Sequence, residues 1–454
     1  MNEREFDVVV IGAGSSGEVC AGRLADGGLR VAIVEGHLVG GECSYYACMP
    51  SKALLRPAQA LAEARRVPGA AEAVTGQLHP GAVLSRRDEV ISNRDDARQL
   101  PWLEEKGIEL IRGEGRLEGA GRVWAADQLL VARKAVVIAT GSEAAVPPVE
   151  GLPAAEPWTN REATTANEVP GRLLVLGGGP VGAELAQAYA TLGSSVVLIE
   201  GAERILARLE EFASEEVAAG LRESGVDVRT GLQAERVSGE RVIRVELTGG
   251  DAVEGDVLLT ATGRRARTGG LGLESAGVEG NGYLEVDDQM RVGGRDDLYA
   301  VGDVNGRALL THMGKYQARI CADHILGADV AATEDREGPP QVVFTEPQVA
   351  AVGHTLGSAR AAGIDARAVD VVTSGTAGAS FHGKDAPGTT RMVVDERRRV
   401  LVGATFVGAD VGEWLHAATV AVVGEVPLSR LWHSVAAYPT RSEIWLKLLE
   451  EYGL

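Results

Sequence analysis

The chain is short of cysteine, because its 454 residues include only four: Cys20, Cys43, Cys48 and Cys321. So few cysteines in a chain of this length cannot build the disulfide framework that is typical of small secreted proteins. Neither a second cysteine pair nor a histidine pair at ligand spacing accompanies Cys43 and Cys48, which argues against a zinc site. The sequence also starts with charged residues and then a strand, without the apolar region of a signal peptide. We therefore expect a cytoplasmic protein without a resident metal.

Long apolar runs and an excess of positive charge are also lacking. No stretch of about 18 apolar residues occurs, so no membrane-spanning helix is expected. The formal net charge of −19 argues against a surface that follows nucleic-acid phosphates. Glycine is abundant instead, with 59 residues spread among the loops, as expected where many turns approach ligands closely.

A first dinucleotide-binding pattern starts at residue 6. The run FDVVVI is typical of a buried parallel strand. Gly12, Gly14 and Gly17 follow in the spacing GxGxxG, then an alanine-rich helix, and then a second strand that ends at Glu35. This order supplies a tight turn, a helix N-terminus for a pyrophosphate and a carboxylate for ribose hydroxyls.

The same pattern returns near residue 172, where LLVLGGGPVGAELA carries Gly177, Gly179 and Gly182, and the following strand ends at Glu200. Two complete fingerprints predict two dinucleotides, with FAD at the first and a nicotinamide nucleotide at the second. The alternative is a degenerate second repeat that binds nothing. Glu200 predicts a preference for NADH over NADPH, because a carboxylate binds the ribose hydroxyls and repels a 2′-phosphate. Arg204 lies close enough to soften that preference.

Three further segments end buried strands at loops that would face ligands. They are AVVIATGS at 135–142, VLLTATGR at 257–264 and LYAVGDV at 298–304. Asp303, at the end of the third segment, could bind hydroxyls of the flavin nucleotide. It could instead cap a helix that begins farther along the chain.

Cys43 and Cys48 lie in the segment GGECSYYACMPSK at 40–52. A close cysteine pair beside a dinucleotide site can exchange two electrons with a flavin. Half a zinc site and two unrelated buried thiols are the alternatives. A helix is expected to begin close to Pro50, and its N-terminus would favour the thiolate form.

These motifs together resemble class I pyridine nucleotide–disulfide oxidoreductases, a family that includes dihydrolipoamide dehydrogenase, glutathione reductase and mercuric reductase. The resemblance extends over nearly the whole chain and includes FTEPQVAAVG and YPTRSE near the C-terminus. It implies an α/β fold with two Rossmann-like three-layer domains and a C-terminal α+β dimerisation domain. The implied domains are 1–143 with 261–337 for FAD, 144–260 for NAD(P) and 338–454 for the interface.

The resemblance also implies roles for individual residues. Cys43 would be the interchange thiol that meets the acceptor, and Cys48 the thiol against the flavin. Lys52 would lie near flavin N5 and pair with Glu184, although both could be ordinary helix-surface residues. The implied FAD-binding residues are Gly12, Gly14, Gly17, Glu35, Lys52, Gly115, Gly141, Asp303 and Thr311. The implied NAD-binding residues are Gly177, Gly179, Gly182, Glu200 and Gly263.

The family's two-fold dimer places the C-terminal tail of one subunit at the active site of the other. The apolar segment 431–449, with Trp432 and Trp445, fits an interface core. Tyr438 occupies the position where the family usually has an acid–base histidine, and Glu443 stands at the expected offset. His433 is the nearest histidine, and we expect it to be a structural helix residue. Mercuric reductase-like members also carry tyrosine here, but this chain lacks their C-terminal cysteine pair.

Two further departures lie beside the thiols, where Glu42 replaces threonine and Ala47 replaces glycine. Glu42 is expected to raise the pKa values of the thiols. The leading prediction is an enzyme that passes electrons from NADH, or from NADPH, through FAD and a Cys43–Cys48 disulfide. The acceptor is a small-molecule or protein disulfide or, because of Tyr438, a quinone, dye or mercuric-type metal ion. A non-catalytic redox-sensing flavoprotein is the remaining alternative.

Overall fold

The computed structural model describes residues 2–280, 282–334, 338–383, 386 and 388–454. The chain divides into two compact units. The first consists of Met1–Pro50, Asp88–Ala145 and Arg264–Arg336, and the second of Ser51–Arg87, Val146–Gly263 and Glu337–Leu454. The finer three-domain division stays a prediction, and its boundary at residue 337 lies outside the described residues. None of the helices described is both long and apolar enough to cross a membrane.

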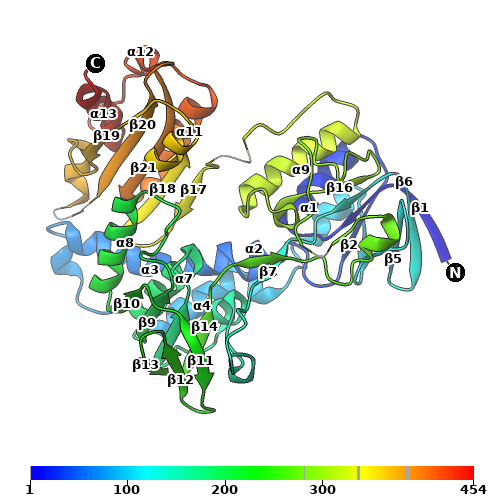
Figure 1. Ribbon diagram of the computed structural model, residues 1–454, viewed down its shortest axis with the longest axis horizontal. Helices are drawn as coiled ribbons and strands as arrows, with labels where there is room; N and C mark the ends of the chain where they lie inside the picture. Colours follow the sequence, from blue (N-terminus) through cyan, green and yellow to red (C-terminus); the bar gives the residue numbers. More distant parts are fainter. Residues whose placement is uncertain (1, 281, 335–337, 384–385, 387) are drawn as a thin grey trace. The chain divides into compact units, whose positions relative to one another are not determined.

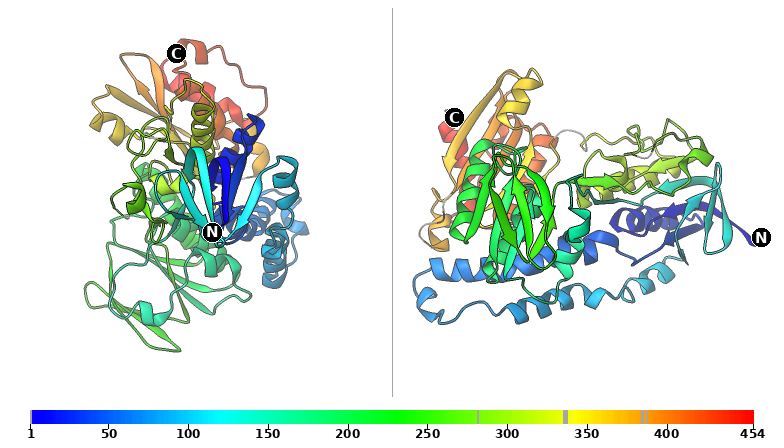
Figure 2. Two further views of the ribbon diagram at one scale, coloured as in Figure 1. Left: turned by 90° about the vertical axis from the view of Figure 1, so that its right-hand side faces the viewer. Right: turned by 60° about the horizontal axis from the view of Figure 1, so that its bottom comes forward.

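The first unit is built on one mixed sheet with the strand order β3-β2-β1-β6-β5-β4, to which β16 adds by pairing with β6. The central strand β1 pairs in parallel with β2 and β6, and Figure 2 (left) views this unit from the N-terminal end of β1. A separate two-stranded sheet joins β7 and β15. The strands are β1 (Asn2–Ile11), β2 (Val31–Glu35), β3 (Glu109–Arg112), β4 (Arg116–Leu117), β5 (Arg122–Ala125), β6 (Gln128–Ile138), β7 (Ser142–Ala144), β15 (Arg264–Ala266) and β16 (Leu298–Ala300).

Apolar side chains from both faces of this sheet are buried, which explains why β1 is a continuous apolar run. On one face, α1 (Ser15–Asp26) packs against α9 (Thr311–Ile325), and Cys20 and Cys321 lie in the core between the helices and the sheet. The shorter helices α2 (Gly41–Tyr45) and α5 (Leu100–Glu105) complete the unit. The division between the two units falls within α3 (Cys48–Arg66) and within α4 (Pro80–Val90).

The second unit contains a parallel sheet with the order β10-β9-β8-β14, covered by α7 and α8. A three-stranded antiparallel sheet, β11-β12-β13, packs beside it, and its green strands can be followed in Figure 2. The elements are α6 (Asn160–Thr165), β8 (Arg172–Leu176), α7 (Pro180–Thr191), β9 (Ser195–Glu200), α8 (Glu211–Glu223), β10 (Val226–Thr230), β11 (Ala234–Ser238), β12 (Ile243–Leu247), β13 (Ala252–Gly255) and β14 (Val257–Thr260).

The C-terminal part of the second unit is a five-stranded antiparallel sheet with the order β17-β18-β21-β20-β19, shown in yellow to orange in Figure 1. Helices α11 and α13 bury their apolar faces against it. The elements are β17 (Gln341–Val343), β18 (Gln348–Gly353), α10 (Leu356–Ala361), β19 (Ala366–Val372), β20 (Thr389–Asp395), β21 (Val400–Gly408), α11 (Leu415–Val423), α12 (Leu428–Leu431) and α13 (Ile444–Tyr452). Two Rossmann-like sheets with parallel central strands and a C-terminal α+β region confirm the predicted fold class.

Candidate active site

The first glycine motif forms a cradle at the N-terminus of α1. Gly12 has φ of +105°, and a Cβ atom there would lie 2.4 Å from the Ala139 carbonyl oxygen. A Cβ atom on Gly17 would lie 1.9 Å from the Gly12 carbonyl oxygen. Only glycine allows strand, loop and helix to approach this closely. A Cβ atom on Gly14 would have its nearest neighbour, Gly41 Cα, at 3.9 Å. The N-terminus of the helix is therefore open to a pyrophosphate.

The carboxylate at the end of β2 completes this cradle. Glu35 Oε2 accepts a hydrogen bond of 2.7 Å from the Ala13 backbone N–H, and Oε1 accepts one of 2.8 Å from the His37 N–H. The side chain is thereby held at the mouth of the glycine loop. This geometry fits the adenosine half of a dinucleotide, whose ribose hydroxyls donate to a carboxylate at this position.

The second motif repeats the same construction within the second unit. Gly177 has φ of +106°, and a Cβ atom on Gly182 would lie 1.9 Å from the Gly177 carbonyl oxygen. Nothing lies within 4 Å of such an atom on Gly179. Glu200 accepts hydrogen bonds from the backbone N–H groups of Gly178 at 2.5 Å and Ala202 at 2.8 Å. The residues present therefore fit a dinucleotide at each motif.

The two predicted redox cysteines lie in two successive helices, one in the middle of a short helix and the other at the start of a long one. Cys43 is in α2, and Cys48 is the first residue of α3, so that helix begins two residues before Pro50. Both carry free thiols, and a resting disulfide between them stays a prediction. Cys48 Sγ lies 3.4 Å from the Thr311 hydroxyl oxygen, at the start of α9.

Cys43 is held in an environment that favours its thiolate. Its pKa is lowered from 9.0 to about 6, and a hydrogen bond with Cys48 is the largest cause. Hydrogen bonds with Thr311 and Ser15 and the positive charge of Lys315 also lower the pKa, and together these effects outweigh burial, which raises it. The thiolate of Cys43 is therefore well populated at neutral pH.

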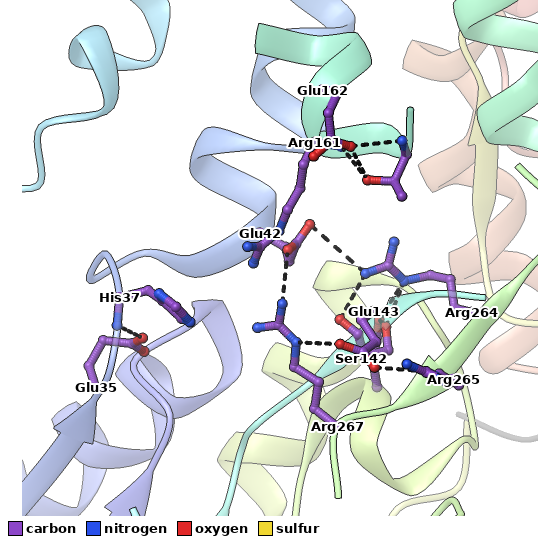
Figure 3. A network of polar contacts seen from close by, with 12 residues as sticks. Glu35, His37, Glu42, Ser142, Glu143, Arg161, Glu162, Arg264, Arg265 and Arg267 are labelled. Atoms are coloured by element: carbon purple, nitrogen blue, oxygen red, sulfur yellow. Dashed lines mark hydrogen bonds and ion pairs between the residues drawn. The ribbon is translucent and has the colours of Figure 1, made fainter. Parts of the chain in front are cut away.

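Glu42 was expected to raise the pKa of this thiol, but the net pKa of Cys43 is lowered and Glu42 is not among its main causes. The Glu42 carboxylate is paired with two arginines, with Oε2 4.0 Å from Arg264 Nη2 and Oε1 3.6 Å from Arg267 Nη2 (Figure 3). Both arginines lie in the segment that follows the second Ala-Thr-Gly sequence, more than 200 residues away in the chain. Their positive charges oppose the effect of the carboxylate on the neighbouring thiol.

The same arginines connect Glu42 to the loops that end two predicted ligand-facing strands. Arg264 Nε donates a hydrogen bond of 2.6 Å to Ser142 Oγ, and that hydroxyl donates one of 2.5 Å to Asp303 Oδ2 (Figure 3 draws Ser142 and both arginines). Burial raises the pKa of Asp303, although Ser142 and Arg264 oppose it. Asp303 does not cap α9, which begins at Thr311 without a side-chain cap. Its side chain instead belongs to this polar network.

Three further glycines that the resemblance assigned to cofactor binding occupy constrained turns. Gly141 follows β6 with φ of +73°, and Gly263 precedes β15 with φ of +135°. Gly115 lies between β3 and β4, where a Cβ atom would lie 2.8 Å from Ile11 Cγ2. Backbone conformation and packing account for these glycines, and their binding roles stay predictions.

The predicted ion pair of the second unit is present. Lys52 Nζ lies 2.7 Å from Glu184 Oε2, and Glu184 is only 4% exposed, so it is not an ordinary surface residue. Glu184 Oε1 accepts a hydrogen bond of 3.0 Å from the Phe344 N–H. The Lys52 ammonium lies 4.7 Å from the centre of the Phe344 ring, within cation–π range. The side chain of Lys52 is therefore held in one orientation.

The tail residues do not form the acid–base pair that is usual in the family. Tyr438 is 77% exposed, and one carboxylate oxygen of Glu443 is buried without a hydrogen-bond partner among the described residues. His433 lies exposed in the turn after α12, so it is not the structural helix residue that was expected. Neither His433 nor Glu443 has a recorded hydrogen bond to the Tyr438 side chain.

The two tail tryptophans, both expected in an interface core, have different environments in the structure. Trp432 is exposed, as a residue awaiting an interface would be. Trp445 instead packs inside its own subunit, with its ring centre 5.9 Å from that of Phe406 and its side chain against the core of the C-terminal sheet. Trp445 therefore belongs to the hydrophobic core of the C-terminal region rather than to an interface.

Sequence reasoning missed several charged and polar residues around the thiols: Ser15, Glu18, Arg264, Arg267 and Lys315. The pKa of Glu18 is raised to about 7, mainly by burial; the charge of Lys315 opposes this rise, and the charges of Glu35 and Cys43 add to it. A signal for Lys315 did exist, because it follows Thr311 by four residues and so shares its helix face. For the two arginines the only signal was their position just after the Ala-Thr-Gly turn.

Comparisons with known proteins agree with this geometry. The family model for pyridine nucleotide-disulphide oxidoreductases matches residues 6–319, and the model for their dimerisation domain matches residues 339–449. The dihydrolipoyl dehydrogenase of Thermus scotoductus is 34% identical over 97% of this chain and 96% of its own length. A mercuric reductase of Staphylococcus aureus is 31% identical over 97% of this chain and 81% of its own. Among solved structures, the Cu(II) complex of the HOCl-induced flavoprotein disulfide reductase RclA from Escherichia coli matches with a TM-score of 0.87 and 28% identity, over 99% of both chains.

Proposed function

Because this chain belongs to the pyridine nucleotide-disulphide oxidoreductase family, we propose that it passes electrons from NADH to an acceptor through a Cys43–Cys48 redox pair. As a member of the family it is an oxidoreductase that depends on FAD and uses NAD(P)H. The observation that carries the proposal is the cluster around Cys43, where a thiol with a lowered pKa touches a second thiol at the start of a helix.

The chain's own residues supply the sites that this chemistry needs. Gly12, Gly14 and Gly17 would hold FAD with Glu35, and the second glycine motif with Glu200 would hold the nicotinamide nucleotide. FAD held there would supply the chemistry that takes a hydride from the nicotinamide and delivers the electron pair to a disulfide. Lys52, fixed by Glu184, would supply a positive charge for that transfer.

On reduction, the bond between Cys43 and Cys48 breaks as the two sulfur atoms take up the electron pair. Cys43 would then meet the acceptor, and the environment that lowers its pKa keeps it as the nucleophilic thiolate. The hydrogen bond between Cys48 and Thr311 would hold the second thiol in place during this exchange.

A test follows from the different parts assigned to the two thiols. Anaerobic titration with NADH should yield two additional thiols per subunit and a long-wavelength absorption band from the Cys48 thiolate beside the oxidised flavin. Cys48→Ser should keep FAD bound but lose that band. Reduction straight to colourless flavin without new thiols would contradict the proposal.

A second candidate class of acceptor is favoured by the exposed Tyr438. Tyrosine is a weak base near neutral pH because its ordinary pKa is near 10, so the exchange with a disulfide substrate lacks its usual proton acceptor. Reduction of a quinone, dye or soft metal ion does not require a proton to be exchanged with the thiols of a disulfide substrate. Two similar proteins are named for metals, one as a mercuric reductase and one as a Cu(II) complex. NADH consumption with lipoamide, glutathione disulfide, a quinone, mercuric ion and cupric ion compares the two classes.

We also propose that the working unit is a homodimer, because the matched C-terminal region is the family's dimerisation domain. Apolar side chains remain exposed on that region, including Val420, Val423, Trp432 and Val435. Light scattering should give about twice the 47.4 kDa mass of one chain. A fully active monomer would contradict this assembly. The cytoplasmic location stays a prediction.

A further inference from the structure

One positively charged residue beside the redox cysteines has no part in the mechanism described so far. Lys315 lies on the first turns of α9, four residues after Thr311 and therefore on the same face of the helix. Thr311 itself contacts Cys48 at 3.4 Å. Lys315 forms no ion pair or hydrogen bond with any other residue that the structure describes. A cation so placed is free to act on the thiols.

The packing of α9 against α1 brings this lysine toward Cys43. The next residue back, Gly314, allows the approach, since a Cβ atom there would lie 2.3 Å from Ser16 Oγ and 3.1 Å from Gly302 Cα. Ser15, the neighbour of Ser16, hydrogen-bonds Cys43, so α1, α2 and α9 meet at the thiol. The charge of Lys315 lowers the pKa values of both Cys43 and Glu18.

The other charged groups near Cys43 do not supply a free cation. Glu42, on the same short helix, is paired with Arg264 and Arg267, so those two positive charges are already opposed. Glu18, on α1, is an acid that competes with the thiolate for the charge of Lys315.

The tail position that corresponds to the family's histidine offers no cation either. Tyr438 stands where the family usually has a histidine, and a phenol is neutral near pH 7. We propose that Lys315 is the cation that stabilises the Cys43 thiolate in this chain, in place of the histidine that the tail lacks.

Lysine carries a fixed charge at neutral pH, whereas a histidine would gain and lose its proton during turnover. Lys315 therefore keeps Cys43 ionised but does not return a proton to a leaving thiol. A site that stabilises the thiolate but cannot donate a proton favours acceptors that need a thiolate and no acid catalyst. The inference rests on the proposed function only where it makes Cys43 the thiol that meets the acceptor.

The test measures the ionisation of Cys43 directly. The FAD-loaded enzyme is reduced anaerobically with dithiothreitol, desalted and alkylated with iodoacetamide between pH 5 and 9. Fragmentation of the tryptic peptide 31–52 separates alkylation at Cys43 from alkylation at Cys48. Because dithiothreitol supplies the electrons, the readout does not depend on reduction by NADH, so failure of the proposed function would not disturb it.

Lys315→Met should move the midpoint of the Cys43 profile upward by up to about one pH unit, since the hydrogen bonds of Cys43 lower its pKa more than this charge does. The alkylation rate at pH 5.5 should fall by up to about tenfold. Lys315→Arg keeps the charge and should restore the wild-type midpoint. Lys106→Met is the matched control, because Lys106 lies in the same unit but pairs with Asp26 at 2.6 Å. It should leave the midpoint unchanged.

Glu18→Gln is a second variant, which keeps the test decisive if Lys315→Met does not fold. Without the Glu18 carboxylate, the Lys315 ammonium group interacts with the Cys43 thiolate only. The midpoint of the Cys43 alkylation profile should therefore fall or stay unchanged. An unchanged midpoint in Lys315→Met, an equal shift in Lys315→Arg, or a rise in Glu18→Gln would each overturn the inference.

Discussion

The Glu42 carboxylate is paired with the Arg267 guanidinium at 3.6 Å, although its neighbour in the chain is the thiol of Cys43. A carboxylate beside a thiol ordinarily opposes ionisation, because two negative charges repel. Here the pairing with Arg267 and Arg264 turns the carboxylate into part of a network that ends at Asp303. The thiol therefore keeps the lowered pKa that its own hydrogen bonds produce.

Arg267→Met should weaken this compensation. The Glu42 charge would then act more strongly on Cys43, and the midpoint of the Cys43 alkylation profile should rise by roughly half a pH unit or more. Arg265→Met is the control, because Arg265 is exposed and pairs with Glu143 at 2.7 Å. A shift of the same size in both variants would show that the pairing with Glu42 has no specific effect.

Glu200→Ala should narrow the preference for NADH over NADPH. Glu200 is held at the mouth of the second glycine loop by two backbone N–H groups, while Arg204 donates its hydrogen bond to the Ala207 carbonyl at 3.1 Å. The ratio of kcat/KM values should change by about 1–3 kcal/mol, the size of a charged hydrogen bond. Glu203→Ala, an exposed neighbour, should leave the ratio unchanged. A wild-type enzyme that favours NADPH would contradict the assignment.

Tyr438→His should improve reduction of lipoamide or glutathione disulfide. A general acid–base group typically contributes about 10²–10⁴-fold, and the gain should approach that range if Glu443 orients the new imidazole. Tyr438→Phe is the control that removes the hydroxyl group but keeps the aromatic ring, and it should have little effect on disulfide turnover. Efficient lipoamide reduction by the wild type, unchanged or lowered in Tyr438→His, would mean that another group supplies the proton.

Glu18→Gln should stabilise the protein more at high pH than at low pH. The pKa of Glu18 is raised from 4.5 to about 7 in the folded state, so the folded state holds the proton more tightly than the unfolded one. The associated stability is fully present below pH 4.5 and is lost as the pH rises to about 7. The gain of the variant should reach about 1–3 kcal/mol at pH 8.

Thermal unfolding of the FAD-loaded enzyme at pH 5 and pH 8 measures the Glu18 effect as a difference in Tm. Glu89→Gln, at an exposed position on α4, serves as the control and should show equal differences at both pH values. A Tm gain in Glu18→Gln that is the same at pH 5 and pH 8 would show that Glu18 does not titrate between them.

The fold could be predicted from the sequence because its signals are local. Gly12, Gly17 and Glu35 are close in the chain, and each is required by a backbone contact that the strand–loop–helix unit always makes. The environment of Cys43 could not be predicted in this way. Arg264, Arg267 and Lys315 reach the cysteine segment from more than 200 residues away, so the sign of the pKa shift depended on tertiary contacts that no spacing reveals.

The tail shows a second limit of sequence reasoning. An apolar segment must be buried, but its composition does not tell whether its own domain or a partner covers it. Trp432 is left exposed while Trp445 packs on Phe406, although the two tryptophans lie in one apolar stretch. The pair Lys52–Glu184 was expected only from the family resemblance, because 132 residues separate the two side chains.

The position of Phe344 has a consequence for attempts to shorten the chain. Its backbone N–H binds Glu184 and its ring faces Lys52, and the neighbouring Glu346 pairs with Arg66 at 2.7 Å. A truncated protein that ends before residue 338 would lose these contacts together with the region that matches the family's dimerisation domain. A redesigned monomer must therefore keep the strand that begins at Gln341 and the loop that follows it, and should remove only the apolar surface of α11 and the tail.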